Sequence, residues 1–334
     1  MVNIVLAGTG DIALKRHIPG LCEARSAVLY GFYNRTSEKA LALSKKYDAR
    51  FYPTWEAVLN DPQADAVLIC TPPSSHAQLA CEALRAGKHV LLEKPMAETV
   101  RDARLIEKAA DESGRLFMML HVQRFYKPHM YAKEIADSGQ IGTPLSIRTI
   151  LCNADQSLLS GQPMPDWHGA LANIGIHRID LLRYLTSSEV TGVFCRSCRQ
   201  IVSPTGYTTE SDEYSSAILE FANGMSGMLI TSRTSFHGED RATQIIGTRG
   251  MVAAYYGGHD LVLETSDNGR RYYDLPDAHP QNVLELTDIH ERFCQAIEKG
   301  QQSPVTAHDG VRSIEILEAL KSSNRGQCWV SLGA

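Results

Sequence analysis

Two glycines near the start of the chain have the spacing of a dinucleotide-binding turn. The segment Gly8-Thr9-Gly10-Asp11-Ile12-Ala13 reads GxGxxA and directly follows the apolar run Val2–Ala7. In this motif the first glycine makes a tight turn, the second lets the backbone approach a pyrophosphate, and the small last residue lets the next helix pack on the strand. That helix adds N–H groups and a partial positive charge at its N-terminus, although Pro19 should kink or shorten it. We therefore predict a dinucleotide cofactor rather than a purely structural turn, bound by Gly8, Thr9, Gly10, Asp11 and Ile12.

Residues about twenty positions farther on bear on the choice between NAD and NADP. An NAD site usually carries Asp or Glu there for the ribose 2′-hydroxyl, whereas this chain reads Tyr33-Asn34-Arg35-Thr36. A carboxylate would repel a 2′-phosphate, but the neutral Asn34, the guanidinium of Arg35 and the hydroxyl of Thr36 would bind one. We therefore expect NADP, with NAD as the alternative if Arg35 is only a solvated loop residue.

Two polar segments follow other apolar runs. Thr71-Pro72-Pro73-Ser74-Ser75-His76 follows Ala66–Cys70, and Glu93-Lys94-Pro95 follows His89–Leu92. Ligands of open α/β sheets bind at the carboxyl ends of the strands, so we predict cofactor contacts from Thr71, Pro72, His76, Glu93 and Lys94. Pro95 requires an extended Lys94 and allows a cis bond that would turn the lysine inward. By itself, however, a Glu-Lys-Pro tripeptide is more often a surface turn.

The elements that would position these residues alternate in the first third of the chain. The apolar runs Val2–Ala7, Val28–Phe32, Ala66–Cys70, His89–Leu92 and Leu116–Leu120 have the length of buried strands. Helical patterns at His76–Ala86 and Thr99–Ser113 lie between them. This alternation predicts βαβ units in an α/β Rossmann domain with a parallel sheet, which we place at residues 1–121.

Beyond residue 121 the pattern changes to longer strands joined by short turns. We predict strands at Leu145–Leu151, Glu189–Val202, Tyr214–Phe221, Gly224–Thr234, Thr243–Gly247 and Gly250–Ala254. Helices are expected at Asn282–Lys299 and His308–Ser322. Residues 122–334 therefore predict an α+β domain with a largely antiparallel open sheet, helices on one face, and a helix 308–322 that packs back on the first domain.

Composition limits the classes of function. The 334 residues are 43% hydrophobic and 21% charged with a net charge of −5, which is typical of a globular protein of two domains and gives no footprint for nucleic acid or an anionic membrane. No signal peptide or membrane-spanning run is evident, so we expect a cytoplasmic protein. Its eight scattered cysteines are expected to be reduced thiols. Cys195 and Cys198 form a CxxC, but on a strand they would point to opposite faces, so we expect no metal site.

Several of these motifs together resemble the glucose–fructose oxidoreductase / inositol dehydrogenase / rhizopine catabolism (Gfo/Idh/MocA) family. The matching segments, in order along nearly the whole chain, are GTGDIA, TPPSSHAQLACEALRAGKHVLLEKP, Gln123-Arg124-Phe125 with Pro128, Ile141-Gly142, GALANIGIHRID (169–180) and Asp309-Gly310. The resemblance implies hydride transfer on sugars or polyols. It also implies a second domain whose sheet forms the substrate face and is often an oligomer contact, so a homo-oligomer is expected.

The resemblance assigns roles to individual residues. Lys94 matches the family's lysine between nicotinamide and substrate hydroxyl, His177 the proton-exchanging histidine, and Asn173 a position where the family often has aspartate. At 100° per residue Asn173, His177 and Asp180 share a helix face, although a solvated polar stripe would look the same. An amide cannot stabilise an imidazolium as a carboxylate does. With Asn173 in place of aspartate, we therefore expect the proton transfer to depend more on Lys94.

The substrate contacts follow from the segments that the family places near its cleft. Arg124, Tyr126 and Trp167 are the predicted ones, together with Asn173 and His177, and Asp155 and His168 lie in the same segments. Trp167 would stack on a sugar face, unless it is a core residue. Two other functions stay open: a glycoside hydrolase of the same fold that keeps NAD bound, and a non-enzymatic cofactor-sensing regulator.

Overall fold

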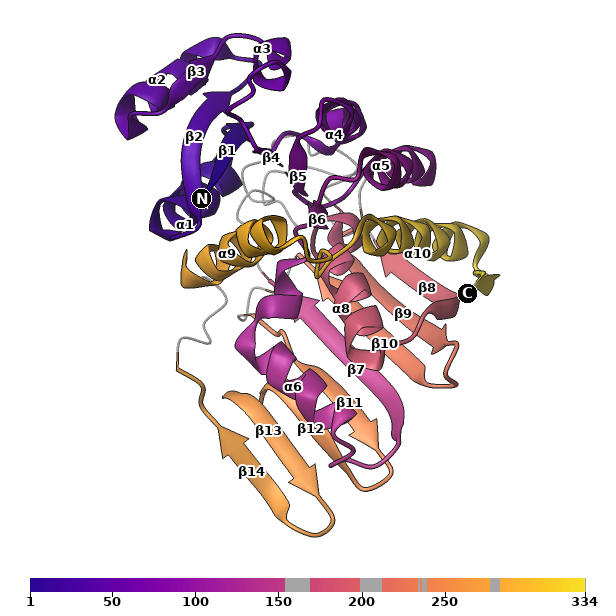
Figure 1. The fold of residues 1–334 in the computed structure, drawn as a ribbon. Coiled ribbons are helices and arrows are strands. Elements are labelled where there is room, and N and C mark those ends of the chain that lie inside the picture. Colours follow the sequence, from indigo (N-terminus) through magenta and orange to yellow (C-terminus); the bar gives the residue numbers. More distant parts are fainter. Residues whose placement is uncertain (154–168, 199–211, 234, 236–238, 277–282, 334) are drawn as a thin grey trace. The chain divides into compact units, whose positions relative to one another are not determined.

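The chain folds into two units in the computed structural model. The first contains Met1–Val122 and His279–Ile314, and the second contains Gln123–Ala278 and Glu315–Ala334. The structure describes all residues except 154–168, 199–211, 234, 236–238, 277–282 and 334. The first unit holds a parallel sheet and the second a larger mixed sheet (Figure 1). Among the described helices, none combines the length and apolar character that a membrane crossing requires.

The sheet of the first unit is entirely parallel and has the order β3-β2-β1-β4-β5-β6. Its strands are β1 (Val2–Ala7), β2 (Ala27–Tyr33), β3 (Arg50–Tyr52), β4 (Ala66–Ile69), β5 (His89–Leu92) and β6 (Phe117–Met119). The predicted α/β class with a parallel sheet is confirmed. The strand order reverses between β1 and β4. At such a switch point the loops that leave the strands diverge, and ligands bind in the crevice between them.

Helices complete the first unit. They are η1 (Ala13–His17), α1 (Ile18–Glu23), α2 (Ser37–Tyr47), α3 (Trp55–Leu59), η2 (Pro73–Ser75), α4 (His76–Arg85), α5 (Val100–Ser113) and α9 (Val283–Lys299), and α10 (Ala307–Gly326) begins here. The first helix is interrupted, as Pro19 predicts: a π-helical turn, η1, precedes it, and Pro19 then occupies the first turn of α1. There its missing N–H breaks no intrahelical hydrogen bond.

The second unit contains a nine-stranded sheet of order β14-β13-β12-β11-β7-β10-β9-β8-β15. Its strands are β7 (Pro144–Cys152), β8 (Val190–Cys198), β9 (Tyr214–Phe221), β10 (Ser226–Ser232), β11 (Thr243–Gly247), β12 (Gly250–Tyr256), β13 (His259–Thr265), β14 (Gly269–Tyr273) and β15 (Val330–Ser331). Only β7 and β10 pair in parallel among these strands, so the predicted largely antiparallel sheet is confirmed. The predicted ends at Val202 and Thr234 lie outside the described residues.

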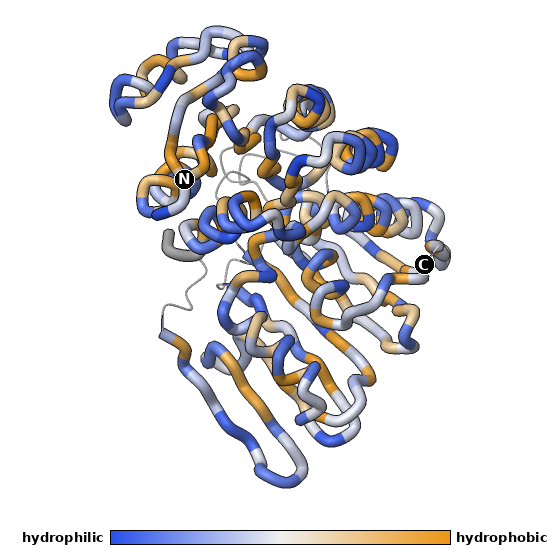
Figure 2. The backbone as a smooth tube through the Cα atoms, viewed as in Figure 1, coloured by the Kyte–Doolittle hydropathy of each residue, from blue (hydrophilic) through white to orange (hydrophobic). Residues whose placement is uncertain are grey.

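One face of this second sheet is covered by helices, and no helix that the structure describes covers the other. α6 (Lys127–Asp137) contacts β12 and β13, and α8 (Ile176–Thr186) contacts β7 and β10. Buried and exposed residues alternate along β9 and β10, but apolar residues run consecutively in both strands, at positions 217–219 and 228–230. Figure 2 shows apolar stretches on the strands of this sheet. Ile218 and Met228, which pair across β9 and β10, are 52% and 46% exposed. The uncovered face therefore carries exposed apolar side chains.

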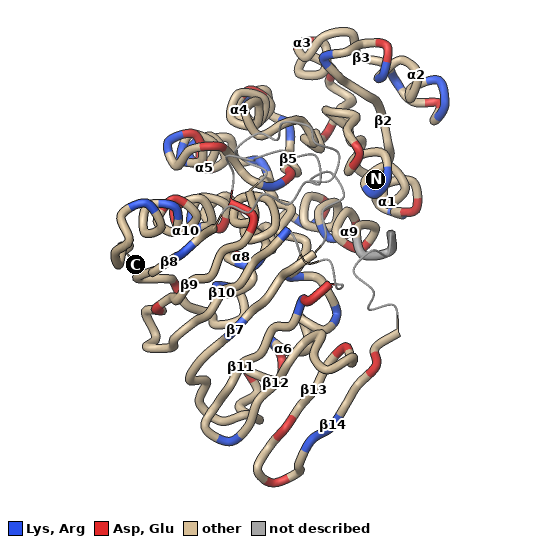
Figure 3. The backbone as a smooth tube through the Cα atoms, turned by 180° about the vertical axis from the view of Figure 1, so that it is seen from behind, with Lys and Arg blue, Asp and Glu red and all other residues tan. Residues whose placement is uncertain are grey.

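The strands of the second sheet carry exposed charged residues and several of the chain's cysteines. Acidic residues on β13 face basic residues on β14 (Figure 3), where Glu264 forms an ion pair with Arg270. All eight cysteines are free thiols. Cys195 is buried and Cys198 is exposed, so this pair points to opposite faces of β8 as predicted.

Candidate active site

Gly8 occupies the point where β1 and β4 diverge. It has a φ of +97°, and a Cβ at this position would lie 2.7 Å from the Cys70 carbonyl and 2.8 Å from the Thr71 nitrogen. Only glycine fits such a backbone, because other residues would be strained and would collide with the end of β4. Gly10 is different, because a Cβ there would meet no atom within 4 Å among the described residues. Gly8 is thus required by the fold, whereas Gly10 leaves space at the start of the helix.

The other residues of this turn fit a bound dinucleotide. The hydroxyl of Thr9 is buried and has no hydrogen-bond partner among the described residues. Asp11 and Ile12 are exposed at the helix start, and Asp11 forms an ion pair of 2.7 Å with Lys15. Hydrogen bonding to Lys15 holds the pKa of Asp11 below its usual value. An unsatisfied hydroxyl, an open glycine and the N-terminus of a helix are the features that bind a pyrophosphate.

The end of β2 presents the predicted ribose-binding residues. The Asn34 side chain donates a hydrogen bond of 3.0 Å to the Thr36 carbonyl and so shapes the turn. Arg35 and Thr36 are exposed, and residues 33–37 contain no carboxylate. The turn can therefore accept a phosphate without repulsion from an acidic residue at this strand end.

His76 joins the loops that follow β4 and β5. Its two ring nitrogens lie 2.9 Å from the Pro95 carbonyl and 2.8 Å from the Thr71 carbonyl. Burial lowers the pKa of this histidine, against the opposing effect of the two carbonyls, so the ring is neutral and donates to one of them. Thr71 is half-buried and Pro72 exposed, so both lie at the surface of this loop. His76 thus supports the loop from inside, and its direct cofactor contact remains a prediction.

Glu93 and Lys94 follow the end of β5 and differ in burial. The Lys94–Pro95 peptide bond is cis, and Lys94 is half-buried. Glu93 is buried: one carboxylate oxygen accepts the Lys94 backbone N–H at 2.9 Å, and the other lies 2.9 Å from His17 Nε2. Glu93 thus faces the interior, and Lys94 is the less buried of the two residues.

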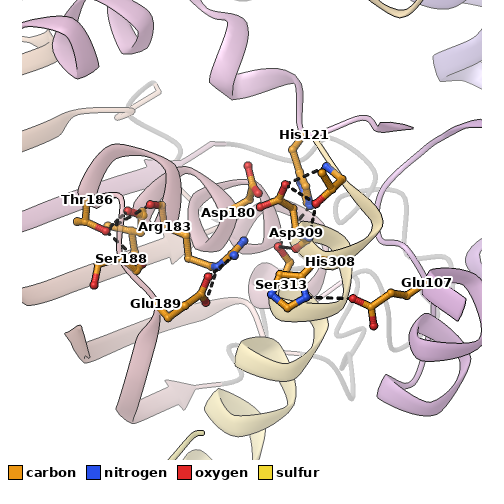
Figure 4. A network of polar contacts seen from close by, with 12 residues as sticks. Glu107, His121, Asp180, Arg183, Thr186, Ser188, Glu189, His308, Asp309 and Ser313 are labelled. Carbon is orange, nitrogen blue, oxygen red and sulfur yellow. Dashed lines mark hydrogen bonds and ion pairs between the residues drawn. The ribbon is translucent and has the colours of Figure 1, made fainter. Parts of the chain in front are cut away.

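The Asp309-Gly310 motif supports the same loop. Asp309 accepts hydrogen bonds from the backbone N–H and hydroxyl of Thr306, and its own N–H bonds the Thr306 hydroxyl, which forms a cap for α10. A Cβ on Gly310 would overlap the sulfur of Met96, two residues after Lys94. Figure 4 shows Asp309 beside Ser313, whose hydroxyl lies 3.3 Å from His121 Nε2. Gly310 therefore allows α10 to pack closely behind the lysine loop.

In the second unit, α8 carries His177. The helix begins after a π-helical segment, η5 (Ala170–Gly175), which contains Asn173. Asn173 and His177 are half-buried, but Asp180 is 0% exposed. The three residues therefore do not form an exposed stripe: Asp180 is buried, and the π-helical segment changes the spacing between Asn173 and His177. Asn173 on η5 and His177 on α8 are therefore the two of these three residues that stay partly exposed.

Arg124 and Tyr126, the two described substrate-contact candidates on the segment before α6, are both buried. The Arg124 guanidinium donates two hydrogen bonds to Asp180, of 2.7 and 2.6 Å. Tyr126 stacks on His129, with ring centroids 5.9 Å apart. On α8, Arg183 pairs with Glu189 (Figure 4). Trp167, Asp155 and His168 lie outside the described residues. Arg124 is thus in large part committed to holding α8.

Arg178 and His129 form a buried basic pair in this unit that no sequence motif predicted. Arg178 is 1% exposed, and it donates to Thr243 at 3.0 Å and to the Arg241 carbonyl at 2.9 Å. Its Nη1 also lies 3.3 Å from His129 Nε2, while His129 Nδ1 lies 2.8 Å from the Gln123 carbonyl. Burial, then the Arg178 charge, lower the pKa of His129 to about 3. A neutral His129 with its proton on Nδ1 satisfies both contacts.

Comparison with known proteins identifies relatives over both units. Residues 2–121 match the model of an oxidoreductase family with an NAD-binding Rossmann fold, and residues 129–253 match the model of the GFO/IDH/MocA C-terminal domain. The chain is 28% identical to scyllo-inositol 2-dehydrogenase (NAD(+)) of Bacillus subtilis, over 82% of this chain and 80% of that protein. It is 26% identical to myo-inositol 2-dehydrogenase of Thermotoga maritima, over 96% of each chain.

Solved structures share the fold of the whole chain. Levoglucosan dehydrogenase in complex with NADH and L-sorbose has a TM-score of 0.90 at 24% identity, covering 100% of this chain and 99% of that one. The scyllo-inositol dehydrogenase of Lactobacillus casei with bound NAD(H) and scyllo-inositol has a TM-score of 0.84 at 20% identity, covering 99% of each. At these identities the likeness establishes the fold.

Proposed function

The chain belongs to the GFO/IDH/MocA oxidoreductase family, and from this premise we propose that it transfers a hydride between a nicotinamide cofactor and a secondary alcohol or ketone of a sugar or polyol. The observation that carries the proposal is the edge of the parallel sheet, where the Gly8 turn and the Lys94 loop leave β1 and β5. The relatives named above act on inositols and on levoglucosan, which supports a polyhydroxylated substrate.

Three residues are proposed for the chemistry. The bound cofactor would accept or supply the hydride, and the protein must manage the accompanying proton. Lys94 hydrogen-bonds the reacting oxygen or takes its proton, and His177 exchanges that proton. Asn173 orients the imidazole or binds a substrate hydroxyl, because an amide has no charge with which to stabilise an imidazolium.

The cofactor is proposed to be held by the first unit, with the 2′-phosphate of NADP against Arg35, Asn34 and Thr36. Thr9, Gly10, Asp11 and Ile12 would surround the pyrophosphate, and Thr71 and Pro72 would border it. The exposure of Arg35 and the absence of a carboxylate at residues 33–37 support NADP. NAD is the alternative, and the NADH-bound relative supports it.

We propose further that the open face of the second sheet joins copies of the chain. Exposed Ile218 and Met228 support this, because monomers rarely expose contiguous apolar patches. Ile218→Glu and Met228→Glu, singly and together, should reduce the mass measured by light scattering. Unchanged mass in the double variant would reject this face as the contact.

The decisive experiment is a substrate screen. Purified protein is mixed with a panel of inositols, anhydrosugars, aldoses and their keto forms, with each cofactor in turn, and absorbance at the nicotinamide band is followed. The named relatives are dehydrogenases, which favours net redox chemistry over the glycosidase alternative. Cleavage of aryl glycosides without a net change in cofactor would contradict the proposal, and cofactor binding without any turnover would favour the regulator.

A further inference from the structure

Three buried side chains form a continuous polar array behind Lys94. Glu93 Oε1 lies 2.9 Å from His17 Nε2, and His17 Nδ1 lies 3.2 Å from His290 Nε2. His17 and His290 are 0% exposed and Glu93 is 9% exposed. The array thus links η1, the end of β5 and α9, although His17 and His290 are 273 positions apart in the sequence.

The charges within the array can be assigned from its surroundings. Burial alone would raise the pKa of Glu93, but the hydrogen bond and charge of His17, together with Lys94, outweigh it and leave the pKa below its usual value. Glu93 is therefore a carboxylate, and the N–H at His17 Nε2 donates a hydrogen bond to it. Burial, then His17, place the pKa of His290 well below its usual value, so His290 is neutral.

The array is connected to Lys94 in two ways. The second oxygen of Glu93 accepts the Lys94 backbone N–H at 2.9 Å, which fixes the main chain where the lysine side chain departs. The Glu93 charge also lies within electrostatic range of the Lys94 ammonium. Among the described residues, Cys70 and His76 also interact with this carboxylate: its charge adds to the effect of burial on the pKa of Cys70 and opposes the lowering of the pKa of His76 by burial. Of these, Cys70 has its pKa raised well above the usual value, first by burial, and stays neutral.

We propose that Glu93, His17 and His290 act as positioning residues for Lys94. The histidines hold Glu93 ionised and fixed in the interior, and Glu93 holds the Lys94 backbone and keeps a negative charge within electrostatic range of its ammonium. A nearby anion favours the charged amine, so the array sets the pH at which Lys94 loses its proton. The catalytic consequence rests on the proposed function, but the effect on the Lys94 proton does not.

The test measures the Lys94 proton directly in the cofactor-free protein. Trace acetic anhydride labels neutral amines, and mass spectrometry of the labelled peptide across pH gives the Lys94 midpoint, with exposed Lys45 as the internal reference. Glu93→Gln is close to isosteric and removes the charge. We expect its midpoint to fall by about one pH unit, which is about tenfold faster labelling at a fixed pH below the midpoint.

Two substitutions at His17 separate positioning from packing. His17→Leu removes the donor to Glu93, raises the pKa of that carboxyl and should shift the Lys94 midpoint downward, toward that of Glu93→Gln. His17→Gln keeps an N–H donor and should restore at least half of the difference. His308→Gln is the matched control, because His308 lies on the exposed side of α10, where it pairs with Glu107 at 3.0 Å (Figure 4).

The outcomes divide clearly. A Lys94 midpoint that is equal in wild type, Glu93→Gln and His17→Leu overturns the inference, whatever the activity. A shifted midpoint in a protein that turns over no substrate keeps the inference and rejects the proposed function. With an active protein, kcat in Glu93→Gln should fall about ten- to hundredfold while the Kd for reduced cofactor stays within about threefold. If Glu93→Gln does not fold, the two His17 variants decide.

Discussion

Arg124 and Asp180 form a buried, bidentate ion pair inside the second unit. Arg124 Nε and Nη2 donate to the two carboxylate oxygens at 2.7 and 2.6 Å, and Asp180 is fully buried. Asp180 follows His177 by three positions on α8, so the pair fixes the helix that carries the proposed proton-exchanging histidine. Arg124, proposed as a substrate contact, thereby has a structural task as well.

Removal of one partner of this pair should destabilise the fold strongly. Asp180→Ala leaves a buried guanidinium without its anion, and we expect a loss of about 3 to 5 kcal/mol in the free energy of unfolding, measured with urea. The control is Glu264→Ala, which breaks an exposed pair with Arg270 and should change stability by less than about 1 kcal/mol. Equal losses in the free energy of unfolding of the two variants would show that the buried pair contributes no more to stability than the exposed pair.

Lys94 should control the chemical step and not cofactor affinity. Lys94→Ala is expected to lower kcat by about 10²- to 10⁴-fold and to leave the Kd for reduced cofactor within about threefold. Lys94→Arg keeps the charge but cannot lose its proton at ordinary pH, so it distinguishes proton transfer from hydrogen bonding. Full activity in Lys94→Ala would remove this lysine from the proposed mechanism. Stopped-flow absorbance measures the step.

Arg35 should distinguish the two cofactors. Arg35→Ala is expected to weaken NADPH about tenfold or more and NADH by less than about twofold, because a bidentate contact to phosphate is lost only for NADPH. Isothermal titration of both reduced cofactors gives the ratio. Equal losses for both would reject the 2′-phosphate contact and leave NAD as the cofactor.

Much of the first unit can be predicted because its strands are buried on both faces. The runs in β1, β4 and β5 are continuous and apolar, and the glycine turn follows the first of them. β3 was not predicted, since it has three residues, one of them exposed. β14 was also missed because all of its residues are exposed, so no apolar alternation marks it. Pairing with β13 forms that strand, and a single sequence does not display pairing.

The candidate site was predictable where one short motif supplies it and not where distant segments meet. Lys94 and its loop follow from a strand end and a proline. The contact between His17 and His290 was not predicted, because the two residues are 273 positions apart and neither has a sequence signal that points to the other. The burial of Asp180 was hidden for the same reason, because its partner Arg124 lies 56 positions away in the sequence and helix periodicity does not show that contact.

His129 should make stability fall as the pH is lowered. Its pKa is about 3 in the fold, against 6.5 when unfolded, so between these values the unfolded chain binds a proton that the folded chain does not. Stability therefore decreases from about pH 6.5 downward, and by pH 5 this residue alone costs on the order of 2 kcal/mol. His129→Gln cannot take up that proton and should flatten the pH dependence measured by urea unfolding. His308→Gln should keep the wild-type slope, and a slope unchanged in His129→Gln would contradict the assignment.

The two glycines of the cofactor turn should respond to alanine in opposite ways. Gly8→Ala combines a φ of +97° with a collision against the Cys70 carbonyl, so the cofactor-free protein should lose about 2 kcal/mol or more of stability. Gly10→Ala meets no atom within 4 Å among the described residues, so the melting temperature without cofactor should stay within about 2 °C of wild type. A methyl group at Gly10 would nevertheless occupy the space proposed for the pyrophosphate, and the Kd for NAD(P)H should rise about tenfold or more. Calorimetry and cofactor titration on both variants separate the effects, and a Gly10→Ala protein that binds cofactor as tightly as wild type would contradict the placement of the pyrophosphate at this turn.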